Sequence, residues 1–210
     1  HALLACLSLA LLTACGGGGE SSTSTPAPVP VVVEKLATRN EAARFLTQAT
    51  FGPVDADIDR VMAVGYAAWI DEQLALPATN VHRTHWQARD QELRAADPNA
   101  RASGDHVLES FWKQAVTGPD PLRQRVAYAL SQIFVISMAD SGVADNTRAV
   151  AAWLDMLGNQ GLGRYRDLLE TVSLHPMMGV YLSHLRNQKA DARTGRVPDE
   201  NFAREVMQLF

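Results

Sequence analysis

Apolar side chains recur at helical spacing along almost the whole chain after residue 37, and this periodicity limits the fold more than any other feature. In the first such segment, the apolar positions i, i+3, i+4 and i+7 are Ala42, Phe45, Leu46 and Ala49. That spacing places them on one face of a helix. No run of apolar and polar alternation is long enough to indicate a strand. The sequence therefore predicts an all-α fold, an irregular bundle of many helices without a significant sheet.

Local signals set the ends of several predicted helices. Thr38 and Glu41 have the spacing of a capping box, in which the two side chains bind free backbone N–H groups at a helix start. A helix over Asp55–Val64 is expected to end at Gly65, because glycine tolerates the left-handed backbone that often follows a helix. A more polar helix is expected over about residues 81–93.

Residues 126–137 carry the strongest sequence signal for burial. Apart from Tyr128, the polar side chains between Val126 and Met138 are Ser131, Gln132 and Ser137. A helix that is apolar nearly all round is expected inside a protein, and this one is too short to span a membrane. We therefore expect it to be the most buried helix, so that Ile133→Ala lowers the stability by about 2–5 kcal/mol.

Composition narrows the class of protein. The chain has 210 residues, of which 47% are hydrophobic and 20% charged, enough for one folded domain without a disulfide or metal. It has 19 Lys and Arg against 23 Asp and Glu and no long basic run, which argues against nucleic acid as a partner. No GxSxG, P-loop, GxGxxG or CxxC motif occurs, so no cofactor is predicted.

The first 37 residues differ in composition from the remainder. Residues 2–12 are apolar and match the length of the hydrophobic region of a signal peptide. The sequence Leu12-Thr13-Ala14-Cys15 then resembles a bacterial lipobox, whose cysteine becomes the lipidated N-terminus. The expected organisation is a lipoprotein signal peptide at 1–14, lipidated Cys15 with a flexible Gly/Ser/Thr/Pro tether at 15–37, and an all-α domain at 38–210, truncated at its C-terminal end.

The residue after the lipobox cysteine bears on location. It is Gly16 and not Asp, which by resemblance to enterobacterial lipoproteins favours the outer membrane of the cell envelope. Cleavage before Cys15 also removes Cys6, so no internal disulfide is expected. The expected partners are the membrane, through the lipid anchor, and envelope polysaccharide or partner proteins.

Three segments resemble one bacterial family. They are AARFLTQATFGP at 42–53, LHPMMGVYL at 174–182 and PDENFAREVMQLF at 198–210. Together, and in this order, they resemble the N-terminal part of the family called domain of unknown function 1800. The resemblance covers roughly residues 38–210 and implies a helical fold and an envelope location. It implies no catalytic assignment.

The last segment predicts a helix with two faces. Its apolar face comprises Phe202, Val206, Leu209 and Phe210, and its polar face comprises Asn201, Arg204, Glu205 and Gln208. In one hypothesis this polar face is a catalytic site, where Arg204 orients a substrate carboxylate or sugar hydroxyl and Glu205 acts as general acid or base. In the other it is a solvated face with an ordinary pair between Glu200 and Arg204. The spacing alone favours the solvated face.

Two further residues are expected to support this region. Asp199 is a plausible N-cap for the last helix. Arg44 interrupts an apolar cluster in the first helix, so its stem is expected to be half-buried and its guanidinium to need an acceptor. We expect Arg44 to approach Glu205 or Glu200.

The histidines suggest structural positions more than a metal site. His175 precedes Pro176 and suits a turn or a helix cap, and it is also a candidate catalytic residue beside the last helix. His184 is expected at the surface. His82 and His85 have no Cys or carboxylate companion nearby in the sequence and are expected to be structural. The spacings match no helical zinc pair, so no metal ligands are predicted.

A polar loop precedes the last helix. Residues 187–198 include Lys189, Arg193 and Arg196, and loops this long are often functional. The loop can act as a lid over the Arg204 and Glu205 face, contact an anionic polymer such as wall polysaccharide or a lipid headgroup, or be a disordered insertion. The sequence does not choose among these.

Two functions follow from the sequence. One is an envelope-anchored binding or assembly module at the cell surface. The alternative is a carbohydrate-active hydrolase or lyase that uses Glu205 and Glu200 with Arg204. Whether the protein is an enzyme stays open at this point.

Overall fold

The first helix, α1 (Arg39–Ala49), begins at the predicted capping box. The carboxylate of Glu41 accepts a hydrogen bond from the Thr38 backbone N–H at 3.0 Å, and Thr38 Oγ1 accepts one from the Glu41 N–H at 3.3 Å. Ala42, Leu46 and Ala49 are buried on one face of the helix. The predicted start of α1 and its apolar stripe are both confirmed.

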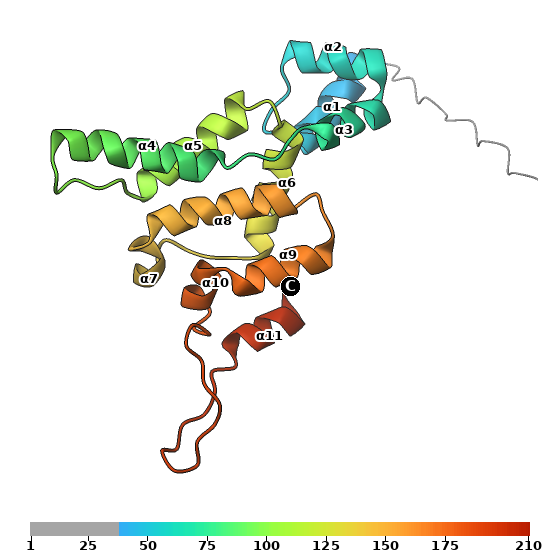
Figure 1. Cartoon of the computed structure of the whole chain (residues 1–210). Coiled ribbons are helices and arrows are strands. Elements are labelled where there is room, and N and C mark those ends of the chain that lie inside the picture. The colour runs from blue at the N-terminus through green and yellow to red at the C-terminus, as the bar shows by residue number, and fades with distance from the viewer. Residues whose placement is uncertain (1–37) are drawn as a thin grey trace, which may run out of the picture. The chain divides into compact units, whose positions relative to one another are not determined.

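The computed structural model describes residues 38–210, and within this range the structure is all-α, as the sequence predicts (Figure 1). One isolated bridge, between Asp191 and Arg196, is the exception to helix and loop among these residues. After α1, the helices are α2 (Asp55–Val64), α3 (Tyr66–Ala75), α4 (Val81–Ala96), α5 (Gly104–Thr117), α6 (Pro121–Ile133), α7 (Ser141–Ala144), α8 (Thr147–Gln160), α9 (Tyr165–Leu174), α10 (Pro176–Tyr181) and α11 (Asn201–Gln208). The predicted lipidation site Cys15, the signal peptide and the tether lie outside the described residues.

Two of these elements show why local signals suffice for some boundaries. Helix α2 covers the predicted residues and ends at Gly65, whose φ of 84° lies in the left-handed region that glycine adopts at little cost. Helix α4 extends to Ala96, a few residues beyond the predicted end, because no glycine or proline interrupts it. None of the described helices is both long and apolar enough to cross a membrane.

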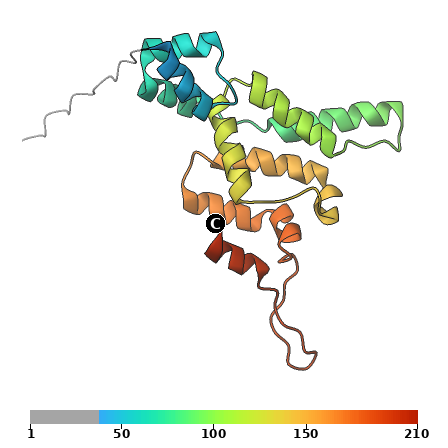
Figure 2. The ribbon, with the colours of Figure 1, turned by 180° about the vertical axis from the view of Figure 1, so that it is seen from behind.

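Helix α8 is the centre of the packing. It contacts α4, α5, α6, α7, α9 and α10, and these neighbours surround it in both views of Figures 1 and 2. Val150, Trp153 and Leu157 are buried along it, and so is the small residue Ala151. Buried residues thus follow one another along most of the helix, which agrees with its packing on several sides.

The expectation that residues 126–137 form the most buried helix is wrong. Helix α6 ends at Ile133, whose side chain is 46% exposed, and Val135 beyond it is also exposed. The buried side of α6 consists instead of Arg123, Gln124 and Ala127. Apolar composition cannot reveal which face finds a packing partner. In α6 the polar face finds one, and several apolar side chains are left at the surface.

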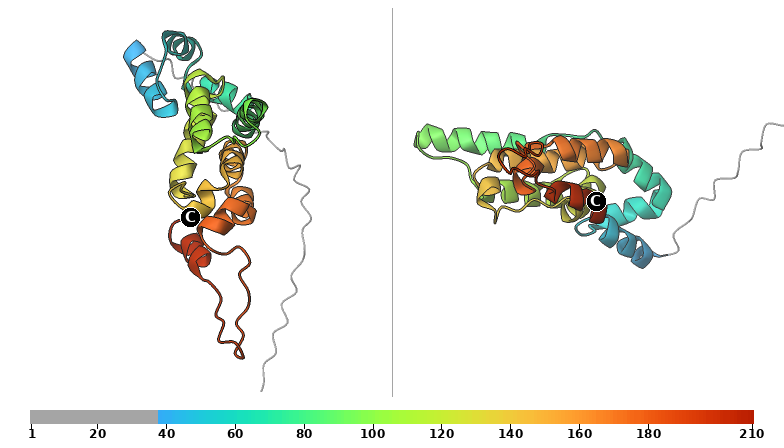
Figure 3. Two further views of the ribbon diagram at one scale, coloured as in Figure 1. Left: turned by 90° about the vertical axis from the view of Figure 1, so that its left-hand side faces the viewer. Right: turned by 90° about the horizontal axis from the view of Figure 1, so that it is seen from below.

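The last helix attaches to the core through aromatic rings. Phe210 packs against Phe134 with ring centroids 4.9 Å apart, and Phe202 packs against His184 at 4.2 Å. Figure 3 shows α11 beside the long loop that precedes it. The predicted apolar face of this helix therefore does face the protein at Phe202 and Phe210.

Candidate functional site

The polar face of α11 carries an ordinary surface ion pair. Arg204 donates to Glu200 Oε1 at 2.7 Å, one helical turn away, and both side chains are largely exposed. Glu205 and Asn201 on the same helix are half-buried. The N-cap position is Glu200 and not Asp199, although Asp199 Oδ1 accepts a hydrogen bond from the Asn201 N–H at 2.9 Å. This geometry agrees with the solvated-face hypothesis.

His175 is a helix cap, as one of the sequence hypotheses has it. Its Nδ1 accepts a hydrogen bond from the Met177 N–H at 3.2 Å at the start of α10, and Pro176 occupies the first position of that helix. The ring packs edge-on against Trp153, with centroids 5.0 Å apart, and burial lowers the pKa of His175. These contacts direct the imidazole toward α8, and none of them involves α11.

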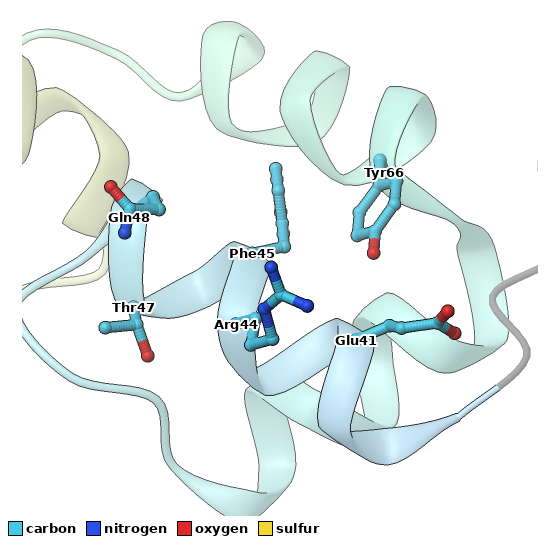
Figure 4. A pocket seen from close by; sticks show the side chains of 6 residues that line it. All are labelled: Glu41, Arg44, Phe45, Thr47, Gln48 and Tyr66. Atoms are coloured by element: carbon cyan, nitrogen blue, oxygen red, sulfur yellow. The ribbon is translucent and has the colours of Figure 1, made fainter.

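The expected pairing of Arg44 with the last helix is wrong. Arg44 is exposed on α1, and Figure 4 shows its side chain over a shallow hollow of about 480 Å³ that Glu41, Phe45 and Tyr66 also line. Among residues 38–210 it forms no ion pair with Glu200 or Glu205. In Figures 1 and 2, α6 and α8 lie between α1 and α11. The buried side of α1 consists of Ala42, Leu46 and Ala49, and Arg44 lies outside it, so its stem needs no burial.

The polar loop over residues 187–198 is held closed at its base. Asn187 Nδ2 donates to the Asp199 carbonyl at 2.6 Å, and the Asp199 N–H donates back to Asn187 Oδ1 at 2.9 Å. Near its tip, the Asp191 N–H donates to the Arg196 carbonyl at 3.0 Å. The loop extends away from α11 (Figures 1 and 3), so in this structure it does not cover the Arg204 and Glu205 face as a lid.

His184 is not the free surface residue that the sequence suggested. Its ring stacks on Phe202, and its Nε2 lies 3.2 Å from the Ser173 carbonyl oxygen. His85 has an acidic companion that sequence distance concealed, because its Nε2 lies 3.5 Å from Glu109 Oε2 on α5. Within residues 38–210, no three His, Cys, Asp or Glu side chains gather in a way that could hold a metal ion.

Charged side chains lie close together in a different region, where α4 packs against α8. Asp155 of α8 is buried and accepts the backbone N–H groups of His82 and Arg83, each at 2.9 Å, which joins it to the first turn of α4. Burial raises the pKa of Asp155, and these two hydrogen bonds oppose the shift. Further along α4, Trp86 Nε1 donates to Thr147 Oγ1 at the start of α8, at 3.1 Å. These contacts hold the two helices in register.

Three arginines line the hollow beside this contact, which we call the arginine groove. Arg83 comes from α4, Arg101 from the loop before α5, and Arg148 from the first turn of α8. The hollow has a volume of about 620 Å³. Asp90 Oδ1 accepts the Ala102 N–H at 2.9 Å, which secures the loop that carries Arg101, and this bond lowers the pKa of Asp90.

The arginine groove has an excess of positive charge. Within residues 38–210, the guanidinium groups of Arg83 and Arg148 form no hydrogen bond or ion pair, and Arg101 donates only to the carbonyls of Pro98 and Ala100. One carboxylate, that of Asp145, also lines the hollow. Helix α8 begins here without a side-chain cap on its first backbone N–H groups. Guanidinium groups donate in a fork that matches carboxylate, sulfate and phosphate oxygens, so the groove suits an anionic ligand.

Sequence reasoning missed this groove because its residues are far apart in the chain. Arg83, Arg101 and Arg148 belong to three separate segments and form no basic run. The overall charge of −4 also gives no sign of a local positive region. The one local signal is Arg148 in the first turn of a predicted helix, a position where acidic side chains are favoured and a basic one is unusual.

A serine and a histidine lie close together behind a neighbouring hollow. His82 Nδ1 is 2.9 Å from Ser110 Oγ, and both side chains are buried. Burial lowers the pKa of His82 to about 4, although Gln124 and Asp120 oppose this shift. A histidine with so low a pKa stays neutral and is a weak base near neutral pH, so this pair serves packing better than nucleophilic catalysis.

Comparison with known proteins gives one match. A family model described as "Protein of unknown function (DUF1800)" matches residues 44–210. No curated protein and no solved structure matches the chain.

Proposed function

The chain belongs to the DUF1800 family of proteins of unknown function, and we propose that it is a binding module of the bacterial cell envelope that holds acidic groups in the arginine groove. The single observation that supports this proposal is that three arginines line one hollow, and that the guanidinium groups of Arg83 and Arg148 form no hydrogen bond or ion pair within residues 38–210. Three cations and one carboxylate, that of Asp145, line this hollow, so its net positive charge favours an anionic ligand.

The enzyme alternative has weaker support. It needs Glu205 and Glu200 to act with Arg204, but Glu200 and Arg204 neutralise each other in an exposed pair. His175, the remaining candidate, is engaged with Met177 and Trp153. Catalytic carboxylates usually occupy a concave site that excludes water, and binding is therefore the function that the geometry favours.

A binding experiment tests the groove. Trigalacturonate, a short chain of acidic sugars, is titrated into the purified protein at low ionic strength and the affinity is measured by calorimetry. Arg148→Glu places a negative charge in the groove, and we expect it to weaken binding by about tenfold or more. Arg166→Glu is the matched control, because Arg166 is an exposed arginine on α9 that does not line the groove. Equal affinities for the two variants would refute the proposed site.

The envelope location rests on the lipobox-like sequence at Cys15 and is tested separately. Cys15→Ser removes the sulfur that would carry the lipid, so we expect the variant to move from the membrane fraction to the soluble periplasmic fraction. One lipid-bearing terminus with several acyl chains anchors a protein firmly, whereas a tether alone does not. Persistence of the variant in the membrane fraction would mean that another feature anchors the protein.

A further inference from the structure

The arginine groove adjoins a second hollow. Arg83 and Ala152 also line a second hollow, of about 190 Å³, together with Asn80, Asn159 and Gln160. The two hollows therefore adjoin along the contact between α4 and α8. Asp155 borders the second hollow too, but both of its carboxylate oxygens accept backbone N–H groups and its side chain is buried.

A third hollow continues the same path. Asn80 lines it as well as the second hollow, and its volume is about 420 Å³. Here the lining includes a cation, Lys113 of α5, and the hydroxyl groups of Thr79 and Thr84. Lys113 is exposed and forms no ion pair within residues 38–210. The three hollows thus form a series around the N-terminal half of α4, with unpaired cations at both ends.

The length of this series suits a polymer. The first hollow lies at the first residues of α8, and the second reaches Asn159 and Gln160 at its last residues. Helix α8 has 14 residues, which corresponds to about 21 Å at a rise of 1.5 Å per residue. The first two hollows lie along this length, and the third adjoins the second at Asn80, so an extended chain can contact all three, whereas a single small anion occupies one of them.

The side chains that line the second hollow are suited to bind sugar hydroxyls. Its amide side chains are those of Asn80, Asn159 and Gln160. Asn159 Nδ2 donates to Asn80 Oδ1 at 2.8 Å, which fixes the orientation of these two amides, and Asn159 Oδ1 is buried. Gln160 therefore offers a donor and an acceptor and Asn80 offers its Nδ2, and sugar hydroxyls, which both donate and accept, can bind these groups.

Single-stranded nucleic acid fits this lining less well. Proteins that bind it stack the bases on exposed aromatic rings. The aromatic rings in the lining are those of Trp86 and His85. Trp86 is 9% exposed with its Nε1 engaged by Thr147, and the His85 side chain is 18% exposed beside Glu109. The lining therefore offers cations and hydrogen bonds without a stacking surface.

We propose that a linear acidic polysaccharide lies along the three hollows, with acidic groups at the arginines and at Lys113 and sugar hydroxyls at the amides between them. This inference rests on the proposed function and adds the class of ligand and its path. It makes Lys113 a binding residue for chains that extend beyond the arginines, because the arginines line the first two hollows and Lys113 lines the third.

Chain length provides the test. The affinity of the protein for trigalacturonate and for hexagalacturonate is measured by calorimetry, with maltohexaose as the neutral control. We expect the hexamer to bind about tenfold or more tightly than the trimer and maltohexaose to bind far more weakly than either. Lys113→Glu is expected to remove most of the gain from the longer chain and to leave trimer binding unchanged. Arg166→Glu, at the exposed arginine of α9 that lines none of the three hollows, is again the matched control and is expected to change neither.

The outcomes separate the two proposals. If the trimer binds and Arg148→Glu weakens it, but the hexamer gains nothing, the arginine groove holds acidic groups and the polysaccharide path is wrong. The path is also wrong if Lys113→Glu and Arg166→Glu behave alike. If neither oligosaccharide binds, the proposed function fails and the path with it. Tighter binding of a single-stranded oligonucleotide than of hexagalacturonate would replace the polysaccharide by nucleic acid. Circular dichroism of each variant confirms that the helices are retained.

Discussion

Helices α6 and α8 pack against each other but bury different kinds of side chain. Along α8 the buried residues are mostly apolar and include Trp153 and Leu157. On α6 they include Arg123 and Gln124, while Ile133 at its end is exposed. In the sequence, the second half of α6 is more apolar than the second half of α8. Burial in these two helices therefore depends on which face packs against a neighbouring helix and not on the apolar content of the helix.

The polar side of α6 has a definite structural role. Arg123 donates to the Gly158 carbonyl of α8 at 3.0 Å and to the Leu76 carbonyl after α3 at 2.7 Å. Asp120 lies 3.6 Å from the same guanidinium and accepts from Gln114 of α5 at 2.8 Å. A buried charge is tolerated only when it is paired and hydrogen-bonded, and these bonds meet that need. Helix α6 thus joins α3, α5 and α8 through polar contacts.

The largest expected effect tests the role of α8. Leu157 is fully buried in the cluster that also contains Trp153 and Phe134. Leu157→Ala leaves a cavity there, so we expect it to lower the free energy of unfolding by about 2–5 kcal/mol. Urea denaturation followed by circular dichroism measures the change. A loss below about half a kcal/mol would show that α8 is not the centre of the packing.

A smaller effect on stability is expected from protonation of His82, which lies near both α6 and α8. Its backbone contacts Asp155 of α8, and burial lowers the pKa of its ring from 6.5 to about 4. Between these pH values the unfolded chain binds the proton and the folded protein does not, so stability is full above pH 6.5 and falls as the pH falls toward 4. The loss is on the order of 3 kcal/mol, and burial of His175 acts in the same direction.

Denaturation midpoints measured across this pH range check the prediction. His82→Gln removes the titrating ring, so we expect its stability to vary less with pH than that of the unmodified protein, whatever its stability at neutral pH. A slope unchanged by the substitution would assign the pH dependence to other groups.

The smallest expected effect falls on α6. Ile133 is 46% exposed, so Ile133→Ala removes little buried area and should lower the stability by about 1 kcal/mol or less. The same denaturation experiment as for Leu157 gives the value, and the ratio of the two losses measures how differently the helices contribute. A loss of 2–5 kcal/mol at Ile133, as large-to-small core substitutions cause, would restore α6 as a buried helix.

Several features were predictable because their causes are local. The bonds between Thr38 and Glu41 link residues three positions apart, and Gly65 ends α2 through its own backbone freedom. The cap at His175 likewise depends on the residues immediately after it. The all-α class follows from the 3.6-residue period, which every segment carries by itself.

The helical class, several helix boundaries and the family resemblance could all be predicted from the sequence, and the match over residues 44–210 confirms the family. The central position of α8, the place of Arg44 and the hollow shared by Arg83, Arg101 and Arg148 could be seen only in the folded structure. The two groups of features differ in the sequence distance over which their causes act. Caps and turns act over three or four residues, whereas burial and charge clusters depend on side chains that packing brings together from distant segments.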